Sequence, residues 1–225
     1  MDADIFRDRE DAGRRLADRL LDYKGRDAIV LAIPRGGVPV GFEIARGIDA
    51  LLDVIVLRKI PVPWNPEAGF GAVTADGTVV LNDNMVRGLG MSQEQIERAA
   101  EEVREEILRR MRIYRKGSTE LPDVRGRPVI LVDDGLASGY TMLAAIKSLE
   151  KHEPSEVVVA VPVASSGAAR LVKPRVNNFI ALIVGERIPF AVADFYRYWS
   201  DLSDEDVLRR LDMAKAEQET PRSTS

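Results

Sequence analysis

The sequence contains no cysteine and a single histidine, and these two absences restrict its chemistry first. Without cysteine the chain has no disulfide, no thiol nucleophile and no thiolate ligand for a metal. The histidine, His152, stands among charged residues just after a predicted helix, where we expect it to be solvated rather than catalytic. Catalysis by this chain must therefore rely on carboxylates, cations, hydroxyls or backbone groups.

Other absences restrict the class of protein. The 225 residues carry a net charge of −4, which disfavours a generally basic nucleic-acid surface but leaves a local basic patch open. No apolar run is long enough to span a bilayer. The first four residues, Met-Asp-Ala-Asp, lack the basic and apolar regions of a signal peptide. These absences predict a cytoplasmic protein without membrane association.

The distribution of apolar residues predicts one α/β domain. With 45% hydrophobic residues, a chain of this length can form one compact core. Short apolar runs alternate with amphipathic stretches, which is typical of a mostly parallel sheet flanked by helices. The predicted strands are 28–33, 53–57, 78–81, 129–132, 156–163 and 179–184, and helices are predicted to begin near Asp8, after Gly37, at Ser92 and at Thr141. We expect one domain over 1–213 with a helical insertion at 85–118, and a disordered tail at 214–225, which is polar and without periodicity.

The long helix predicted over 92–116 begins with Ser92 and Gln95, a capping-box pattern. Its apolar residues recur at helical spacing and form one stripe. The stripe contains Ile96, Ala100, Val103, Ile107, Met111 and Tyr114. It fits either packing on the domain or contact with a second copy in a homodimer.

Segment 129–141, Val-Ile-Leu-Val-Asp-Asp-Gly-Leu-Ala-Ser-Gly-Tyr-Thr, is the most informative part of the chain. Four apolar residues predict a buried strand, Asp133 and Asp134 stand at its end, and a helical pattern begins at Thr141. The glycines between them let the backbone approach a ligand, and the loop N–H groups and helix N-terminus favour an anion. Because carboxylates repel a bare phosphate, the acidic pair favours a ligand that also carries vicinal hydroxyls or a metal, such as a sugar phosphate.

An alternative interpretation of the same segment is an acidic turn in which Ser138 or Thr141 caps the helix. That alternative does not account for the whole order of strand, acidic pair, small-residue loop and helix. The whole order resembles the signature with which type I phosphoribosyltransferases bind 5-phosphoribosyl 1-pyrophosphate (PRPP). The resemblance implies a mostly parallel central sheet flanked by helices, with a small hood built from terminal segments.

The resemblance also implies roles for single residues. In the family both acidic positions serve the ribose hydroxyls, so Asp133 and Asp134 are expected to be catalytic and to hold Mg²⁺, mostly through water and PRPP. The loop that would hold the 5′-phosphate contributes Gly135, Ala137, Ser138, Gly139, Tyr140 and Thr141. Neighbouring residues at a strand end point to opposite sides, so the two carboxylates share one role only if the chain turns between them.

A second candidate anion loop follows the first predicted strand and contains Pro34, Arg35, Gly36 and Gly37. A Gly-Gly turn before a helix is suited to an anion, with Arg35 as a cation beside it, although a plain tight turn has the same pattern. In the resembled family this loop binds the pyrophosphate of PRPP and often contains a strained or cis peptide. We therefore expect Arg35, Gly36 and Gly37 to bind substrate, with such a peptide near Arg35.

The next predicted strand ends with Arg58 and Lys59, and residues 61–77 follow without apolar periodicity. An irregular segment of this length predicts a lid. In the resembled family a mobile loop closes here over the site, which implies that Arg58 and Lys59 contact pyrophosphate in catalysis. The alternative for both is an ordinary surface cation. Glu67 is a candidate to face the substrate, although nothing in the sequence fixes its role.

Aromatic residues gather near the C-terminus, where the chain holds Phe190, Phe195, Tyr196, Tyr198 and Trp199. Such rings can stack on a flat heterocycle or pack in a core. The resemblance implies a hood at 186–213. With the motifs at 6–9, 65–67 and 203–207, the chain is similar to a group of predicted phosphoribosyltransferases. Its hood does not match the purine, orotate or uracil subfamilies closely enough to name a base.

The resemblance implies displacement of pyrophosphate from C1 of PRPP by a nitrogen nucleophile, with inversion and with Mg²⁺. Two other classes remain open. One is a regulator that senses PRPP without catalysis, which the acidic charge and the lack of an appended basic domain disfavour. The other is a receiver-like domain with Asp133 or Asp134 as phosphoacceptor. A receiver needs a Lys at the end of a later strand, and 161–165 has none.

Overall fold

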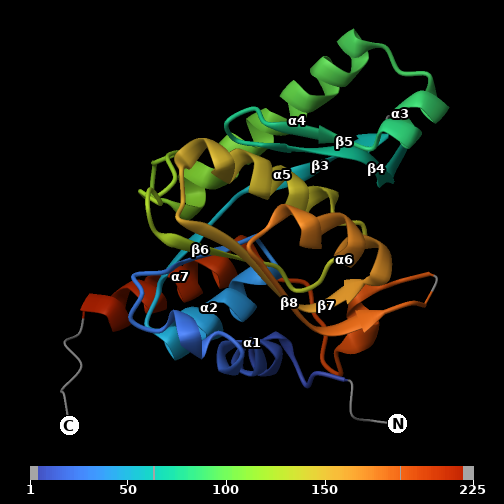
Figure 1. The fold of residues 1–225 in the computed structure, drawn as a ribbon. Coiled ribbons are helices and arrows are strands. Elements are labelled where there is room, and N and C mark those ends of the chain that lie inside the picture. The colour runs from blue at the N-terminus through green and yellow to red at the C-terminus, as the bar shows by residue number, and fades with distance from the viewer. Residues whose placement is uncertain (1–4, 63, 188, 220–225) are drawn as a thin grey trace, which may run out of the picture.

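The computed structural model describes residues 5–62, 64–187 and 189–219 (Figure 1). Its centre is a sheet with the strand order β2-β1-β6-β7-β8, in which every neighbouring pair is parallel. The strands are β1 (Ile29–Ala32), β2 (Leu51–Val54), β6 (Pro128–Val132), β7 (Glu156–Ser165) and β8 (Asn178–Gly185). The predicted α/β fold with a parallel central sheet is confirmed.

Helices cover both faces of this sheet, which explains why its strands are mostly apolar. Alternate residues of β1 point to opposite layers: Val30 and Ala32 pack with α1, α2 and α7, whereas Ile29 and Leu31 pack with α5 and α6. The helices are α1 (Arg9–Asp18), α2 (Gly37–Ile48), α5 (Tyr140–Leu149), α6 (Ser166–Val172) and α7 (Asp204–Glu219). The helix starts predicted near Asp8, after Gly37 and at Thr141 are confirmed within one residue.

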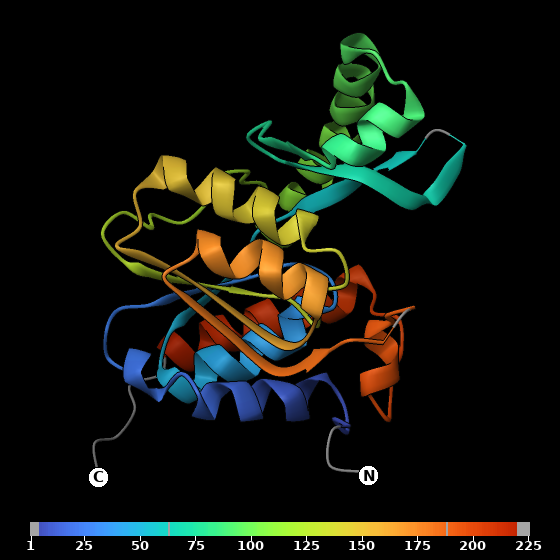
Figure 2. The ribbon, with the colours of Figure 1, turned by 45° about the vertical axis from the view of Figure 1, so that its right-hand side comes forward.

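A second sheet, which is antiparallel, lies beside the first and is seen in teal in the upper right of Figure 2, below the green helices. It consists of β3 (Leu57–Val62), β4 (Asn65–Thr74) and β5 (Val79–Leu81). The prediction of one strand at 53–57 is wrong, because the chain leaves the central sheet after Val54 and enters β3 at Leu57. The prediction of an irregular segment at 61–77 is also wrong, since β4 occupies most of it.

Glycines explain why β4 has no apolar alternation. A Cβ on Gly69 would lie 3.0 Å from the Cβ of Lys59, and one on Gly71 would lie 2.7 Å from the carbonyl oxygen of Val80. Both glycines therefore stand where a neighbouring strand passes close to the backbone. The same residue type that predicts a loop here permits close strand pairing.

Two helices follow this sheet, α3 (Asp83–Leu89) and α4 (Gln93–Tyr114). The predicted capping box of α4 is present: the Ser92 hydroxyl accepts from the Gln95 N–H, and the Gln95 side chain accepts from the Ser92 N–H. The apolar stripe of α4 is buried in the chain's own core together with residues of β3 and β4. The packing interpretation of the stripe is confirmed, so this stripe does not offer a surface to a second copy.

The C-terminal helix α7 packs against α2 and β2, and it buries Val207 and Ala214. The prediction of a disordered tail from 214 is therefore wrong as far as Glu219, because α7 continues to that residue and Ala214 packs on the core. Residues 220–225 lie outside the described residues. Of the segment predicted as a hood, 204–213 belongs to α7 on the core, and its other described residues, 186–187 and 189–203, are mostly irregular around a short 3-10 helix, η4 (Val192–Phe195).

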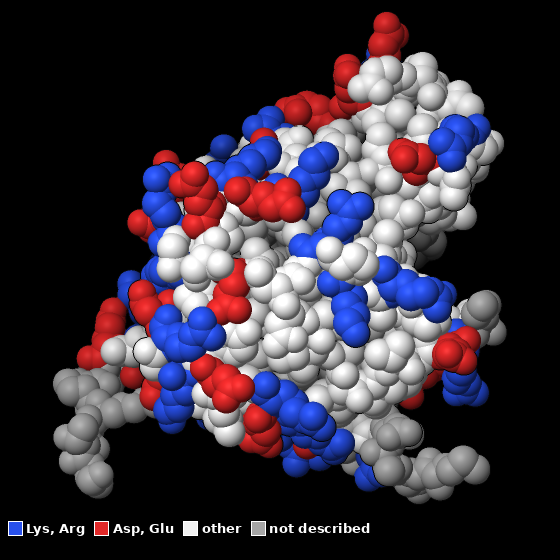
Figure 3. Space-filling model, in the orientation of Figure 1, with Lys and Arg blue, Asp and Glu red and all other residues white. Residues whose placement is uncertain are grey.

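Charge is mixed over most of the face shown in Figure 3, with a group of basic side chains where α5 and α6 lie. This pattern agrees with the net charge of −4 and with the expectation that no basic field covers the whole molecule. Among the described residues, no helix is both long and apolar enough to cross a membrane.

Candidate active site

The loops that follow β1 and β6 lie side by side, because these parallel strands are neighbours and end at the same edge of the sheet. The Ile33 N–H donates to the carbonyl oxygen of Val132 at 2.8 Å. A Cβ on Gly37 would lie 2.9 Å from the Cα of Asp133. The structure thus brings together the Arg35–Gly37 loop and the acidic pair, which are far apart in the sequence.

The Pro34–Arg35 peptide in the first loop is cis, as expected near Arg35. The Arg35 side chain is exposed, and Gly36 precedes α2 as its N-cap residue. The Gly37 N–H is already bonded to the Ile33 carbonyl at 3.0 Å. Arg35 and the N-terminus of α2 are consequently the parts of this loop with positive charge to offer an anion.

The second loop, 135–139, is held by the end of β7. The N–H of Leu136 donates to the Val163 carbonyl, and the N–H of Ser165 donates to the Leu136 carbonyl, both at 2.8 Å. The Ser165 hydroxyl donates to the Ala137 carbonyl at 2.7 Å. These bonds fix the loop on the edge of the sheet, while the side chains of Ala137 and Ser138 stay exposed.

Gly139 is the N-cap residue of α5, with φ of +81°, and no side chain caps this helix. The alternative in which Ser138 or Thr141 is the cap is therefore wrong. A Cβ on Gly135 would lie 2.6 Å from Val192 of η4, so the hood segment packs directly on the start of the loop. The Ser138 and Thr141 hydroxyls are left to donate to an anion at this helix N-terminus.

The two carboxylates have different surroundings. Asp134 forms an ion pair with Arg9 of α1, with 2.8 Å between Oδ2 and Nε. Asp133 accepts a hydrogen bond from the Asp134 N–H at 2.8 Å. Burial and the nearby charge of Asp134 raise the pKa of Asp133 well above its ordinary value. The two carboxylates therefore lie close together, but among the described residues only Asp134 is paired with a cation.

The predicted cations of β3 lie on different sides of the small sheet. Arg58 pairs with Glu106 of α4 at 3.5 Å. Lys59, the next residue, points to the opposite side of the strand. The side chain of Glu67 lies outside what the structure describes. Arg58 is thus engaged with α4 rather than with the acidic pair, whereas Lys59 stays a candidate.

Several residues at the site were not predicted from the sequence. Besides Arg9 and Ser165, Tyr196 donates its hydroxyl to the Asp134 carbonyl at 2.7 Å, and burial raises the pKa of this tyrosine. Tyr196 packs against Phe6 with ring centroids 5.5 Å apart, which confirms core packing for this member of the aromatic cluster. Tyr198 is 67% exposed. The sequence signal for Ser165 was a serine directly before a helix, and the signal for Arg9 was the N-terminal motif at 6–9.

Residues 3–195 match the model of the family described as phosphoribosyl transferase domain. The chain belongs to this family. It is 39% identical over 210 residues to a protein named "Putative phosphoribosyl transferase" in two strains of Mycobacterium tuberculosis, covering 93% of this chain and 47% of that protein. This phosphoribosyl transferase chain thus spans about half the length of the curated relatives it matches.

A solved structure resembles the whole phosphoribosyl transferase domain. The crystal structure of the protein TT1426 from Thermus thermophilus has a TM-score of 0.76 and 39% sequence identity. The similarity covers 92% of this chain and 97% of the Thermus chain. It extends beyond the motifs and includes the elements that place them.

Proposed function

We propose that the protein transfers the 5-phosphoribosyl group of PRPP to a nitrogen nucleophile, such as a nucleobase, and releases pyrophosphate. One observation carries the proposal: the two candidate anion loops, after β1 and β6, meet the acidic pair at one edge of the sheet. PRPP carries an anionic group at each end of a ribose. Two anion loops on either side of two carboxylates match that order of groups.

Each part of the site has a task in this reaction. Arg35, the loop backbone at Gly36 and Gly37, and Lys59 would hold the leaving pyrophosphate. The loop from Gly135 to Thr141 would hold the 5′-phosphate with its N–H groups and hydroxyls. The acidic pair would receive the ribose hydroxyls and offset positive charge that develops on the sugar ring. Catalysis would come from orientation and from fixed charges rather than from a protein nucleophile.

The donor set fits Mg²⁺ bound largely through substrate. In the described part of the chain, no group of three or more His, Asp or Glu side chains could hold a metal alone. Mg²⁺ retains several waters and binds through one or two carboxylates and substrate phosphates. Asp133 and Asp134 would therefore hold it mostly through water and PRPP, and its charge would stabilise the departing pyrophosphate.

The test is to incubate the protein with PRPP and Mg²⁺ in the presence of a panel of nucleobases and amines, and to measure pyrophosphate. We expect release that depends on one class of acceptor and that is lost in Asp133→Asn. Asp123→Asn is the matched control, because the side chain of this exposed aspartate accepts a hydrogen bond from the N–H of Arg125 within its own turn. PRPP binding without release for any acceptor would favour the sensing alternative, and neither binding nor release would contradict the proposal.

A further inference from the structure

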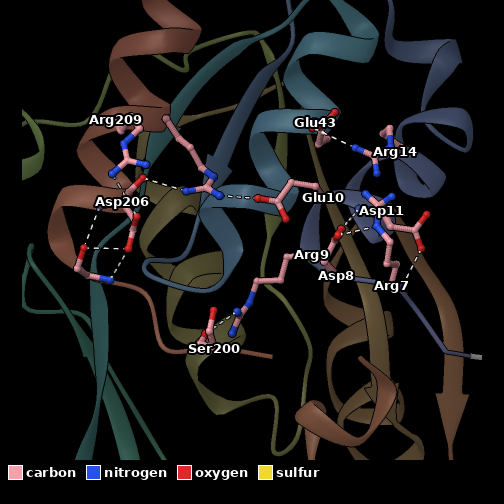
Figure 4. A network of polar contacts seen from close by, with 12 residues as sticks. Arg7, Asp8, Arg9, Glu10, Asp11, Arg14, Glu43, Ser200, Asp206 and Arg209 are labelled. Atoms are coloured by element: carbon pink, nitrogen blue, oxygen red, sulfur yellow. Dashed lines mark hydrogen bonds and ion pairs between the residues drawn. The ribbon is translucent and has the colours of Figure 1, made fainter. Parts of the chain in front are cut away.

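Arg9, the first residue of α1, is buried at the edge of the site. Its exposed fraction is 8%, and arginine is rarely buried without partners. Besides the ion pair with Asp134, its guanidinium donates to the Ser200 carbonyl at 2.9 Å and lies 3.7 Å from the ring centroid of Trp199. Figure 4 shows the Arg9 side chain reaching Ser200, apart from the ion pair of Arg7, which precedes α1, and from that of Arg14 on the same helix. Arg9 therefore connects α1, the acidic pair and the hood segment.

The first loop confines the carboxylate of Asp134 from a second direction. A Cβ on Gly36 would lie 1.9 Å from Oδ2 of Asp134 and 2.4 Å from its Cγ. The carboxylate thus fills the space in which residue 36 would carry a side chain. The side chain of Asp134 is 15% exposed. The Oδ2 atom is held between Arg9 and the backbone of Gly36, which fixes its orientation.

Within the described chain Asp133 has no ion pair of its own, although its carboxyl group lies close to that of Asp134. Its Oδ1 accepts from the Asp134 N–H, and in the described residues no Lys or Arg lies within ion-pair distance of it. One carboxylate of the pair is consequently neutralised by a buried cation, and the other is left to meet a ligand. This division departs from the expectation that both carboxylates meet the ribose.

We propose that Arg9 is a positioning residue that holds Asp134 against the first loop and leaves Asp133 as the carboxylate that meets the ribose hydroxyls of PRPP. The assignment rests on the proposed function. When both carboxylates are ionised, they and the Arg9 guanidinium together carry one net negative charge. Without Arg9 they carry two, and Asp134 is free to turn toward the anionic ligand, so binding of sugar phosphates should weaken.

The test is a set of four variants, Asp133→Asn, Asp134→Asn, Arg9→Gln and the double variant Arg9→Gln with Asp134→Asn. Calorimetry with ribose 5-phosphate, and with PRPP and Mg²⁺, gives the affinities. We expect Asp133→Asn to weaken both ligands about tenfold or more, as for loss of a charge-assisted hydrogen bond, and Asp134→Asn to weaken them less. Arg9→Gln should weaken them about tenfold, and adding Asp134→Asn should restore most of that loss, since the uncompensated charge is gone.

The rescue separates positioning from a purely structural role, because a helix that merely lost its anchor would not recover affinity when Asp134 is also changed. Arg15→Gln is the matched control: Arg15 lies on the same helix, pairs with Asp11 at 2.8 Å, has its guanidinium 5.3 Å from the centroid of the Phe6 ring and forms no ion pair with Asp133 or Asp134. If Arg9→Gln does not fold, the comparison of Asp133→Asn with Asp134→Asn still decides which carboxylate meets the ribose. Equal losses of affinity in those two variants, or no rescue in the double variant, would overturn the assignment of Arg9 but would leave the proposed function standing. A wild-type protein that binds neither ligand would overturn the proposed function and this assignment with it.

Discussion

Replacing Gly36 by alanine should disrupt the site through one contact. The backbone at Gly36, with φ of −62° and ψ of −36°, is one that alanine adopts freely, so the substitution causes no backbone strain. The added methyl would lie 1.9 Å from Oδ2 of Asp134. An ordinary contact needs about 3.4 Å or more, so the carboxylate must move by about 1.5 Å. A shift of that size breaks the bond to Arg9, because an ion-paired N···O distance is about 2.8 Å.

The expected cost follows from the burial of the pair. Breaking a fully buried ion pair costs about 3–5 kcal/mol. Because the displaced Asp134 carboxylate can recover part of its hydration, we expect the free energy of unfolding to fall by about 2–3 kcal/mol. Urea denaturation measures this loss, with an unchanged m-value as evidence that the fold is kept. Gly88→Ala is the control: no atom lies within 4 Å of its added Cβ, and α3 should gain about 0.5–1 kcal/mol.

A double-mutant cycle between Gly36 and Asp134 identifies the cause of this loss. In an Asp134→Ala background the clash has no partner, so Gly36→Ala should then cost less than about 0.5 kcal/mol. If Gly36→Ala is as stable as wild type, or costs the same in both backgrounds, the carboxylate does not rest on Gly36 and the reasoning is refuted.

Two further substitutions address the loop at 135–139 and the small sheet. Ser165→Ala removes the 2.7 Å hydrogen bond to the Ala137 carbonyl and the N-cap of α6. We therefore expect the free energy of unfolding, measured by urea denaturation, to fall by about 1–2 kcal/mol, and inorganic phosphate to bind more weakly in calorimetry. If both values are unchanged, Ser165 does not hold the loop. Hydrogen bonds from Arg109 and Arg110 lower the pKa of Glu106 to about 2. Because this folded-state pKa lies below the unfolded value, the stabilisation is present above about pH 4.3 and is lost as the pH falls toward 2. Glu106→Gln should therefore lower the free energy of unfolding by up to about 1 kcal/mol at pH 7, because solvent screens this exposed pair. At low pH the urea midpoint of the variant should approach that of wild type. A difference between the two midpoints that stays constant with pH would contradict the lowered pKa of Glu106.

The sequence predicted the parts of the fold in which local pattern and burial agree. β1 and β6, and β7 between its two ends, are apolar because both faces of the sheet are covered, and the capping box at Ser92 marks the start of α4. In the small sheet, the strand predicted at 78–81 is confirmed as β5, whereas β4 was missed because it carries glycines where its neighbours approach, which removes the alternation that identifies a strand. The end of α7 was missed because a polar surface helix with few apolar residues has the composition of a tail.

For the site, the sequence identified the two loops and the acidic pair but not their environment. An ion pair between Arg9 and Asp134 depends on where α1 lies on the sheet, and no local pattern encodes that distance. The same holds for Arg58, whose partner Glu106 is set by the packing of α4 on β3. Motifs therefore predicted which residues gather, whereas tertiary packing decides which charges are already paired.

The most direct test of the account is calorimetric titration of the wild-type protein with PRPP, with and without Mg²⁺, beside ribose 5-phosphate and pyrophosphate. The account predicts that PRPP binds, that Mg²⁺ strengthens the binding, and that each of the two fragments binds more weakly than PRPP because it occupies only part of the site. Absence of PRPP binding at millimolar concentration with Mg²⁺ present would contradict it.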